Sequence, residues 1–228
     1  MPVAGREIEF ASNGEPARGY LAVPASGRGP GVVVIQEWWG LVDHIREVCD
    51  RLAREGFVAL APDLYRGDST GDPDEASRLM MDLEIPRAAR DLGGAVKALL
   101  DHDAVDGPKV GAVGFCMGGQ LALYAATRER RVGAVVDFYG IHPKVTLDLS
   151  GLEAAVLGIF AERDAFVPPP AARKLESELE HAGKRVEIRI FPGVDHGFMN
   201  DTRPDVHDAA AAARAWADAV AFLRRELG

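Results

Sequence analysis

Short apolar runs recur along this chain and alternate with longer stretches in which apolar side chains return every three or four positions. The runs have the length of buried strands and cover residues 31–35, 58–61, 110–113, 134–138, 155–160 and 186–191. Helical patterns occupy residues 44–55, 88–101, 117–128, 170–182 and 206–227, with Gly56 and Gly183 after two of them as expected at helix ends. Buried strands that alternate with helices predict an α/β fold with a doubly wound, mostly parallel sheet.

The first residues follow a different pattern. Two alternating segments, 7–10 and 18–23, flank the turn residues Ser12, Asn13 and Gly14, which predicts an antiparallel hairpin at an edge of the sheet. Residues 67–82 are the least regular stretch, and we expect them to form a cap or a wall of a binding site. No internal repeat interrupts the pattern, so we expect a single domain over residues 1–228.

The composition of this chain argues against some classes of partner. With 228 residues, of which 47% are hydrophobic, it can bury a substantial core. The formal net charge of −9 argues against binding to nucleic acid or to an anionic membrane, because both require a basic surface. No segment approaches the roughly 20 apolar residues of a membrane span. We expect a soluble, cytoplasmic protein that acts on a small molecule, as a monomer or a small homo-oligomer.

The sequence Gly114-Phe-Cys-Met-Gly-Gly119 directly follows the apolar run that ends at Val113. This is the pattern of a nucleophile elbow, a sharp strand-to-helix turn, with Cys116 where serine is usual. Glycines beside the turn let the backbone pass closely, and the N–H groups at the start of the following helix favour a thiolate. We therefore expect Cys116 to be an exposed nucleophile. The other cysteine, Cys49, lies in an amphipathic helical pattern and is interpreted as packing, without a disulfide.

A nucleophile needs a base, and the base needs a group that orients it. Asp164 and His196 each follow an apolar strand, and loops at the carboxyl ends of parallel strands converge on one crevice. The order nucleophile, acid, histidine is that of α/β-hydrolases. We assign His196 as general base and acid and Asp164 as the carboxylate that orients it. The alternatives are a helix N-cap role for Asp164 and an acid role for Asp195.

Two backbone N–H groups are expected to form the oxyanion hole, those of Met117 and Trp38. Trp38 lies in the segment 36–40 after an apolar strand, together with Glu37 and Trp39. A carboxylate beside the thiol disfavours a thiolate unless the carboxylate itself takes the proton. Glu37 is therefore either a proton acceptor or a plain salt-bridge partner. The tryptophans are interpreted as pocket or core aromatics.

Neither a metal nor a cofactor is expected. The remaining histidines show no paired spacing such as His-x-x-x-His; they are His44, His102, His142, His181 and His207.

These motifs resemble those of the dienelactone hydrolases, the carboxymethylenebutenolidase branch of the α/β-hydrolases, over essentially the whole chain. The similar segments are Gln36-Glu37, Pro62-Asp63-Leu64-Tyr65, residues 114–119, Phe138-Tyr139-Gly140, the Asp164 loop and His196-Gly197-Phe198. The resemblance implies that Glu37 hydrogen-bonds the thiol and takes up its proton when substrate binds. It also makes Tyr139 a candidate substrate contact, and Trp39 and Phe198 are further candidates.

The chain departs from the family pattern at two positions. Members that cleave dienelactone hold its carboxylate with arginines, and the corresponding positions here are Asn200 and the neighbourhood of Pro73. Asn200 is kept as a candidate substrate contact, and Arg78, Arg163 and Arg203 are candidates to replace the arginines.

The sequence thus predicts a hydrolase that opens an ester or lactone through a thioester on Cys116, without a cofactor. Two alternatives stay open. The same fold could transfer the acyl group to a thiol or amine, or the chain could be a non-catalytic relative that binds a ligand or senses oxidants through Cys116.

Overall fold

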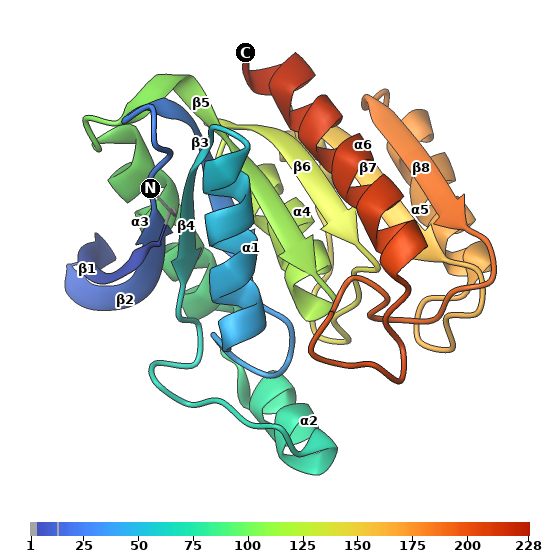
Figure 1. The fold of residues 1–228 in the computed structure, drawn as a ribbon. Coiled ribbons are helices and arrows are strands. Elements are labelled where there is room, and N and C mark those ends of the chain that lie inside the picture. The colour runs from blue at the N-terminus through green and yellow to red at the C-terminus, as the bar shows by residue number, and fades with distance from the viewer. Residues whose placement is uncertain (1–3, 13) are drawn as a thin grey trace.

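In the computed structural model, which describes residues 4–12 and 14–228, an eight-stranded sheet lies between two layers of helices (Figure 1). The strands are β1 (Arg6–Ser12), β2 (Glu15–Ala22), β3 (Gly29–Ile35), β4 (Val58–Pro62), β5 (Val105–Phe115), β6 (Val132–Phe138), β7 (Ala155–Ala161) and β8 (Val186–Phe191). The helices are α1 (Asp43–Arg54), α2 (Pro73–Asp82), α3 (Ile85–Leu100), α4 (Met117–Arg128), α5 (Pro169–His181) and α6 (Ala209–Leu227), with a short 3₁₀ helix at Leu149–Gly151.

The strand order is β1-β2-β4-β3-β5-β6-β7-β8. β1 and β2 pair antiparallel, β2 pairs antiparallel with β4, and the strands from β4 to β8 are parallel to their neighbours. This confirms the predicted mostly parallel sheet with an N-terminal hairpin. Asn13, part of the predicted hairpin turn, lies outside the described residues. β3 and β5 are adjacent in the middle of the sheet, so the loops that follow them meet at its centre.

Helices cover both faces of the sheet because its strands are apolar on both faces. α1 and α6 lie on one face, where Ile45 and Leu223 are fully buried, and α3 and α4 pack on the other, where Leu121 is fully buried (Figure 1). Cys49 of α1 has no exposed surface, which confirms its packing role, and burial raises the pKa of its thiol. None of the described helices combines the length and the apolar character that a bilayer span requires.

Three helices differ from the sequence prediction. α3 begins at Ile85, three residues before the predicted start at residue 88. Residues 67–82 include α2, which begins after Asp72, whose side chain accepts a hydrogen bond from the Glu75 N–H. The periodicity missed this helix because only Ala76 and Leu79 of it are buried. The last helix begins at Ala209, three residues later than expected from the pattern that starts at residue 206, where the preceding aspartate caps its first turn.

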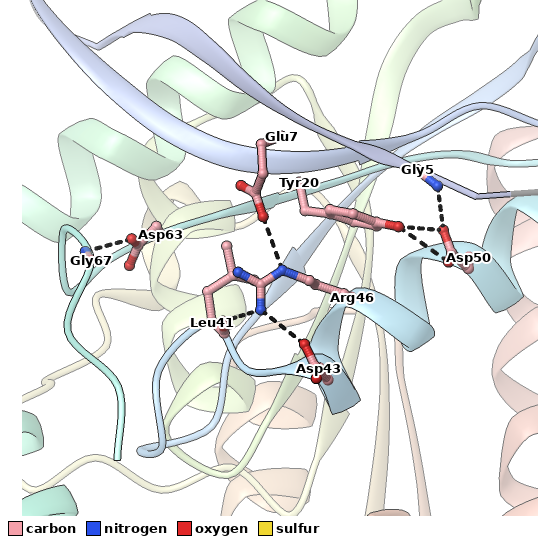
Figure 2. Close-up of polar contacts among 9 residues, drawn as sticks. All are labelled: Gly5, Glu7, Tyr20, Leu41, Asp43, Arg46, Asp50, Asp63 and Gly67. Atoms are coloured by element: carbon pink, nitrogen blue, oxygen red, sulfur yellow. Dashed lines mark hydrogen bonds and ion pairs between the residues drawn. The ribbon is translucent and has the colours of Figure 1, made fainter.

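Polar contacts hold the N-terminal hairpin against α1 (Figure 2). Arg46 donates to Glu7 of β1 (2.9 Å) and to the Leu41 carbonyl (2.7 Å), and the Tyr20 hydroxyl of β2 donates to Asp50 (3.1 Å). Leu41 closes the loop that follows β3. Arg46 therefore fixes the end of the loop that carries Glu37 and Trp38.

Candidate active site

The chain turns sharply from β5 into α4 at Cys116, whose φ of 54° and ψ of −124° are rare for a residue with a side chain. Neighbouring glycines allow the turn. A Cβ at Gly114 would lie 1.9 Å from the Gly118 carbonyl oxygen, and a Cβ at Gly118 would lie 2.4 Å from the Ile35 carbonyl oxygen. The strained turn with glycines on either side is therefore present as the motif predicts.

Cys116 is 8% exposed, so the expectation of an exposed thiol is wrong. The thiol lies instead in a cavity of about 390 Å³, because loops from several strands rise around the centre of the sheet. The walls come from the loop after β3 (Glu37, Trp38, Trp39), α2 (Pro73, Met80), the loop after β7 (Arg163, Phe166) and the loop after β8 (Asp195, His196, Asn200, Arg203). Residues 67–82 thus provide a wall of this cavity, as anticipated.

His196 and Asp164, 32 positions apart in the sequence, are in direct contact. His196 Nδ1 lies 2.7 Å from Asp164 Oδ2. The other oxygen, Oδ1, accepts the backbone N–H groups of Phe166 (2.7 Å) and Val167 (2.8 Å). Pro168 caps α5, without a side-chain hydrogen bond, so Asp164 is not its N-cap. With Oδ1 occupied by two fixed donors, Oδ2 is the oxygen that orients the imidazole.

Backbone contacts between the two loops bring this pair together. The Glu162 N–H donates to the Phe191 carbonyl (2.9 Å), and the Arg163 N–H donates to the Val194 carbonyl (3.0 Å). The Glu162 carboxylate also accepts the Gly193 N–H (2.8 Å). The loop that carries the acid and the loop that carries the histidine therefore form one connected unit.

Asp164 and His196 each favour the charged form of the other. Burial opposes a charge on either group, yet their mutual attraction outweighs it, so the pKa of Asp164 is lowered below its usual value. Burial likewise opposes protonation of His196, but interactions with Asp164 and with the Cys116 sulfur raise the pKa of His196 to about 10. The cysteine, histidine and aspartate named from the sequence thus lie in one interacting group.

Glu37 is almost fully buried, at 2% exposure, and its partner is an amide. Asn200 Nδ2 donates to Glu37 Oε2 at 2.7 Å. Asn200, which also lines the cavity, therefore contacts the carboxylate beside the thiol.

The two N–H groups expected to form the oxyanion hole are available. Neither the Trp38 N–H nor the Met117 N–H donates to another group within residues 4–12 and 14–228. Met117 is the first residue of α4, where backbone N–H groups have no partner within the helix. The Trp38 and Trp39 rings meet edge to face at 5.0 Å, and both line the cavity.

Two predicted substrate contacts are not among the residues that line the cavity. Tyr139 and Phe198 have no exposed surface and pack against each other, with ring centroids 5.7 Å apart. The centroid of the Tyr139 ring lies 4.9 Å from that of the His196 ring, so the tyrosine packs against the imidazole. Burial, then the charges of Glu37 and Cys116, raise the pKa of Tyr139 well above its usual value.

The three candidate arginines differ in whether they line the cavity. Arg78 is not among the residues that line the cavity and pairs with Glu75 and Asp82 of α2, each at 2.6 Å, so its assignment as a substrate contact is corrected. Arg163 and Arg203 both line the cavity.

Sequence reasoning missed Phe166 and Met80. Phe166 is 60% exposed and lines the cavity, and its ring is tilted against that of His196 with centroids 5.1 Å apart. Its position two residues after the acid was the available signal, since this loop had to border the site. Met80 lies on the helix that the periodicity missed.

The doubly wound sheet, with a strained nucleophile turn between its central strand and the next helix, defines this chain as an α/β-hydrolase. Residues 17–227 match the model described as "Dienelactone hydrolase family". The chain is 38% identical to "Protein usf" of Aquifex pyrophilus, over 98% of this chain and 99% of that protein. It is 36% identical to a "Putative carboxymethylenebutenolidase" of Aquifex aeolicus, with the same coverage.

Among solved structures, it superposes on a "Putative Dienelactone Hydrolase" from Klebsiella pneumoniae with a TM-score of 0.88 and 28% identity, over 99% of this chain and 100% of that one. The chain therefore belongs to the dienelactone hydrolase family and is a carboxylic ester hydrolase.

Proposed function

We propose that this enzyme hydrolyses an ester or lactone with Cys116 as nucleophile, His196 as acid and base and Asp164 as the orienting carboxylate. The observation that carries the proposal is the 2.7 Å contact between Asp164 and His196, in which the imidazole lines the same cavity as a cysteine in a strained turn. Cysteine and histidine differ in role because sulfur forms the bond to carbon while the imidazole moves protons.

In the first half of the reaction the Cys116 sulfur attacks the carbonyl carbon, and its proton passes to His196, directly or through Glu37. The oxyanion that forms is stabilised by the N–H groups of Trp38 and Met117, whose donors are free. The intermediate then collapses, the carbon–oxygen bond to the leaving group breaks, and protonated His196 gives the alkoxide its proton. A thioester on Cys116 remains.

In the second half, His196 removes a proton from water and the hydroxide attacks the thioester. The carbon–sulfur bond breaks, the carboxylic acid leaves, and the sulfur departs as a thiolate. Asp164 holds the imidazole through Nδ1 in both halves, so that Nε2 faces the reacting atoms.

The cavity walls also indicate the substrate. Trp38, Trp39, Met80 and Phe166 provide apolar surface, which suits an apolar body on the substrate. The guanidinium groups of Arg163 and Arg203 provide partners for a carboxylate, and they lie at positions different from those of the family arginines. A panel of lactones and short esters, with and without a free carboxylate, tests this part of the proposal.

The mechanism is tested by hydrolysis of a small activated ester such as p-nitrophenyl acetate. Cys116→Ala and His196→Ala should each lower kcat/KM by about 10³-fold or more, with the fold checked by circular dichroism. Cys116→Ser should be active but slower. Mass spectrometry of His196→Ala after brief exposure to the ester should detect the acylated cysteine. Full activity in both alanine variants would exclude the proposed triad, and preferential transfer of the acyl group to an added thiol or amine would identify an acyltransferase.

A further inference from the structure

The amide of Asn200 is held in one orientation. Its Oδ1 accepts the Thr202 backbone N–H at 3.1 Å and the Thr202 hydroxyl at 2.6 Å. A backbone N–H can only donate, so the atom that faces it must be the amide oxygen. The amide nitrogen must therefore face Glu37, whose Oε2 lies 2.7 Å away.

This contact joins two buried groups, since Asn200 and Glu37 are each 2% exposed. A buried carboxylate without a donor is costly, and here the donor is neutral. The amide satisfies Oε2 without neutralising the carboxylate. Oε1 is left as the oxygen available to the Cys116 thiol, which lines the same cavity.

Asn200 also belongs to the loop that carries the histidine. It lies four residues after His196, and its backbone N–H donates to the Gly197 carbonyl at 2.9 Å. A single turn therefore connects the histidine of the cavity with the partner of the Glu37 carboxylate.

We infer that Asn200 is a positioning residue, which holds the Glu37 carboxylate in place through a neutral donor so that it can receive the proton of Cys116. The inference rests on the proposed role of Glu37 as proton acceptor. Asn200 acts on the reaction through Glu37, and its neutral donor is essential because a second carboxylate at this place would compete for a proton.

Other charged groups face this contact from several elements. The loop after β8 contributes Asp195, His196 and Arg203, and the loop after β7 contributes Arg163. The turn between β5 and α4 contributes Cys116, and the charge of Glu37 also acts on Tyr139. Any pH effect must therefore be assigned by comparing variants that differ only at residues 37 and 200.

Asn200→Asp is the decisive variant because it keeps the shape and replaces the donor by an acid. Oδ1 still meets Thr202, so the second oxygen faces Glu37 at hydrogen-bond distance. Two carboxyl groups this close share one proton at low pH, which preserves both a donor and a single negative charge. When that proton leaves at higher pH, the two anions repel each other and Glu37 loses its position.

Two readouts follow from this. The first is kcat/KM for p-nitrophenyl acetate between pH 5.5 and 9. We expect Asn200→Asp to remain close to wild type at the acid end and to fall at least tenfold below it at the alkaline end. The second is the rate at which iodoacetamide labels Cys116, followed by peptide mass spectrometry, which needs no turnover and should show the same alkaline loss relative to wild type.

The matched control is Glu37→Gln combined with Asn200→Asp. This pair of changes leaves one carboxylate. The additional fall at alkaline pH should therefore be absent from the pH profiles of both kcat/KM and the labelling rate. Asn200→Leu removes the donor at similar size and should lower kcat/KM by about 10- to 100-fold, as for a lost hydrogen bond to a charge. Thermal unfolding of each variant shows whether the fold is retained.

An Asn200→Asp profile parallel to that of wild type at every pH, or an alkaline loss that persists in the double variant, would overturn the inference. A purely structural role for Asn200 would lower both rates equally at all pH values. Failure of the proposed function is distinguishable, because it would abolish ester turnover in wild type while the labelling profiles still report on the coupling of residues 37 and 200.

Discussion

Replacing Asp164 with asparagine tests the mechanism most directly, because the structure dictates how the new side chain must lie. Its oxygen will accept the N–H groups of Phe166 and Val167, which lie 2.7 and 2.8 Å from Oδ1. The amide nitrogen will then face His196 Nδ1 as a donor, where Asp164 now accepts at 2.7 Å. Nδ1 must become the acceptor, so the neutral imidazole carries its proton on Nε2 and cannot take one from the thiol.

The size of the effect follows from the charge that Asp164 stabilises. The pKa of His196 rises from 6.5 to about 10 despite its burial, through Asp164 and Cys116 together. That rise corresponds to on the order of 5 kcal/mol in favour of the protonated imidazole. Loss of the Asp164 share, combined with the wrong tautomer, should lower kcat/KM by about 10³- to 10⁴-fold, as for the same change in a serine protease triad.

The interaction between Asp164 and His196 should also stabilise the fold, by an amount that depends on pH. Because the pKa of folded His196 lies above its unfolded value of 6.5, the pair stabilises the fold fully below pH 6.5 and loses this contribution as the pH rises through about 10. In Asp164→Asn most of this pH dependence should vanish.

The assay combines p-nitrophenyl acetate kinetics with urea unfolding at pH 6 and pH 10. Asp195→Asn is the matched comparison, since Asp195 precedes His196 and lines the cavity but is exposed. It should reduce activity far less. An Asp164→Asn enzyme within tenfold of wild type, or a larger loss in Asp195→Asn, would refute the assignment of the acid.

Three further predictions concern groups around this site. Gly118→Ala places a Cβ 2.4 Å from the Ile35 carbonyl oxygen, so it should destabilise the fold by roughly 1–3 kcal/mol in urea unfolding and lower activity; unchanged stability would show that the turn can relax. Burial raises the pKa of Asp137 from 3.8 to about 7, so wild type should lose on the order of 4 kcal/mol relative to Asp137→Asn as the pH rises from 4 to 8, and equal pH dependence in both would contradict this. Arg163→Gln and Arg203→Gln should each raise KM for esters with a free carboxylate by about tenfold, as for a lost charge-assisted contact, while KM for neutral esters should stay within about twofold; equal changes for both substrates would exclude a carboxylate subsite.

Much of the fold could be read from local pattern. Each strand from β3 to β8 overlaps a predicted apolar run, because a strand buried on both faces is continuously apolar. β8 is the exception in burial, since it alternates apolar and charged residues and only Phe191 of it is buried. The turn at Cys116 was also readable, since Gly114 and Gly118 are required by contacts within a few residues or with the adjacent strand. α2 was missed because a helix with two buried positions carries little periodic signal.

The site was readable only in part. The order of Cys116, Asp164 and His196 named the residues, but their contact depends on two loops joined by backbone hydrogen bonds. The expectation of an exposed thiol failed because exposure depends on loops whose conformation the sequence pattern does not specify. Arg78 was a reasonable candidate until its ion pairs within α2 became visible.

By itself, the sequence determined the class of fold and the strained turn at Cys116, because each depends on patterns or contacts among residues that are close along the chain or in adjacent strands. Only the tertiary structure decided which groups face the thiol. Glu37 and Asn200 are 163 positions apart, and no local pattern links them. The sheet brings β3 and the loop after β8 to one end of the molecule, and a hydrogen bond of 2.7 Å then depends on their exact separation in space. For this reason the buried partner of Glu37 could be found only from the folded chain.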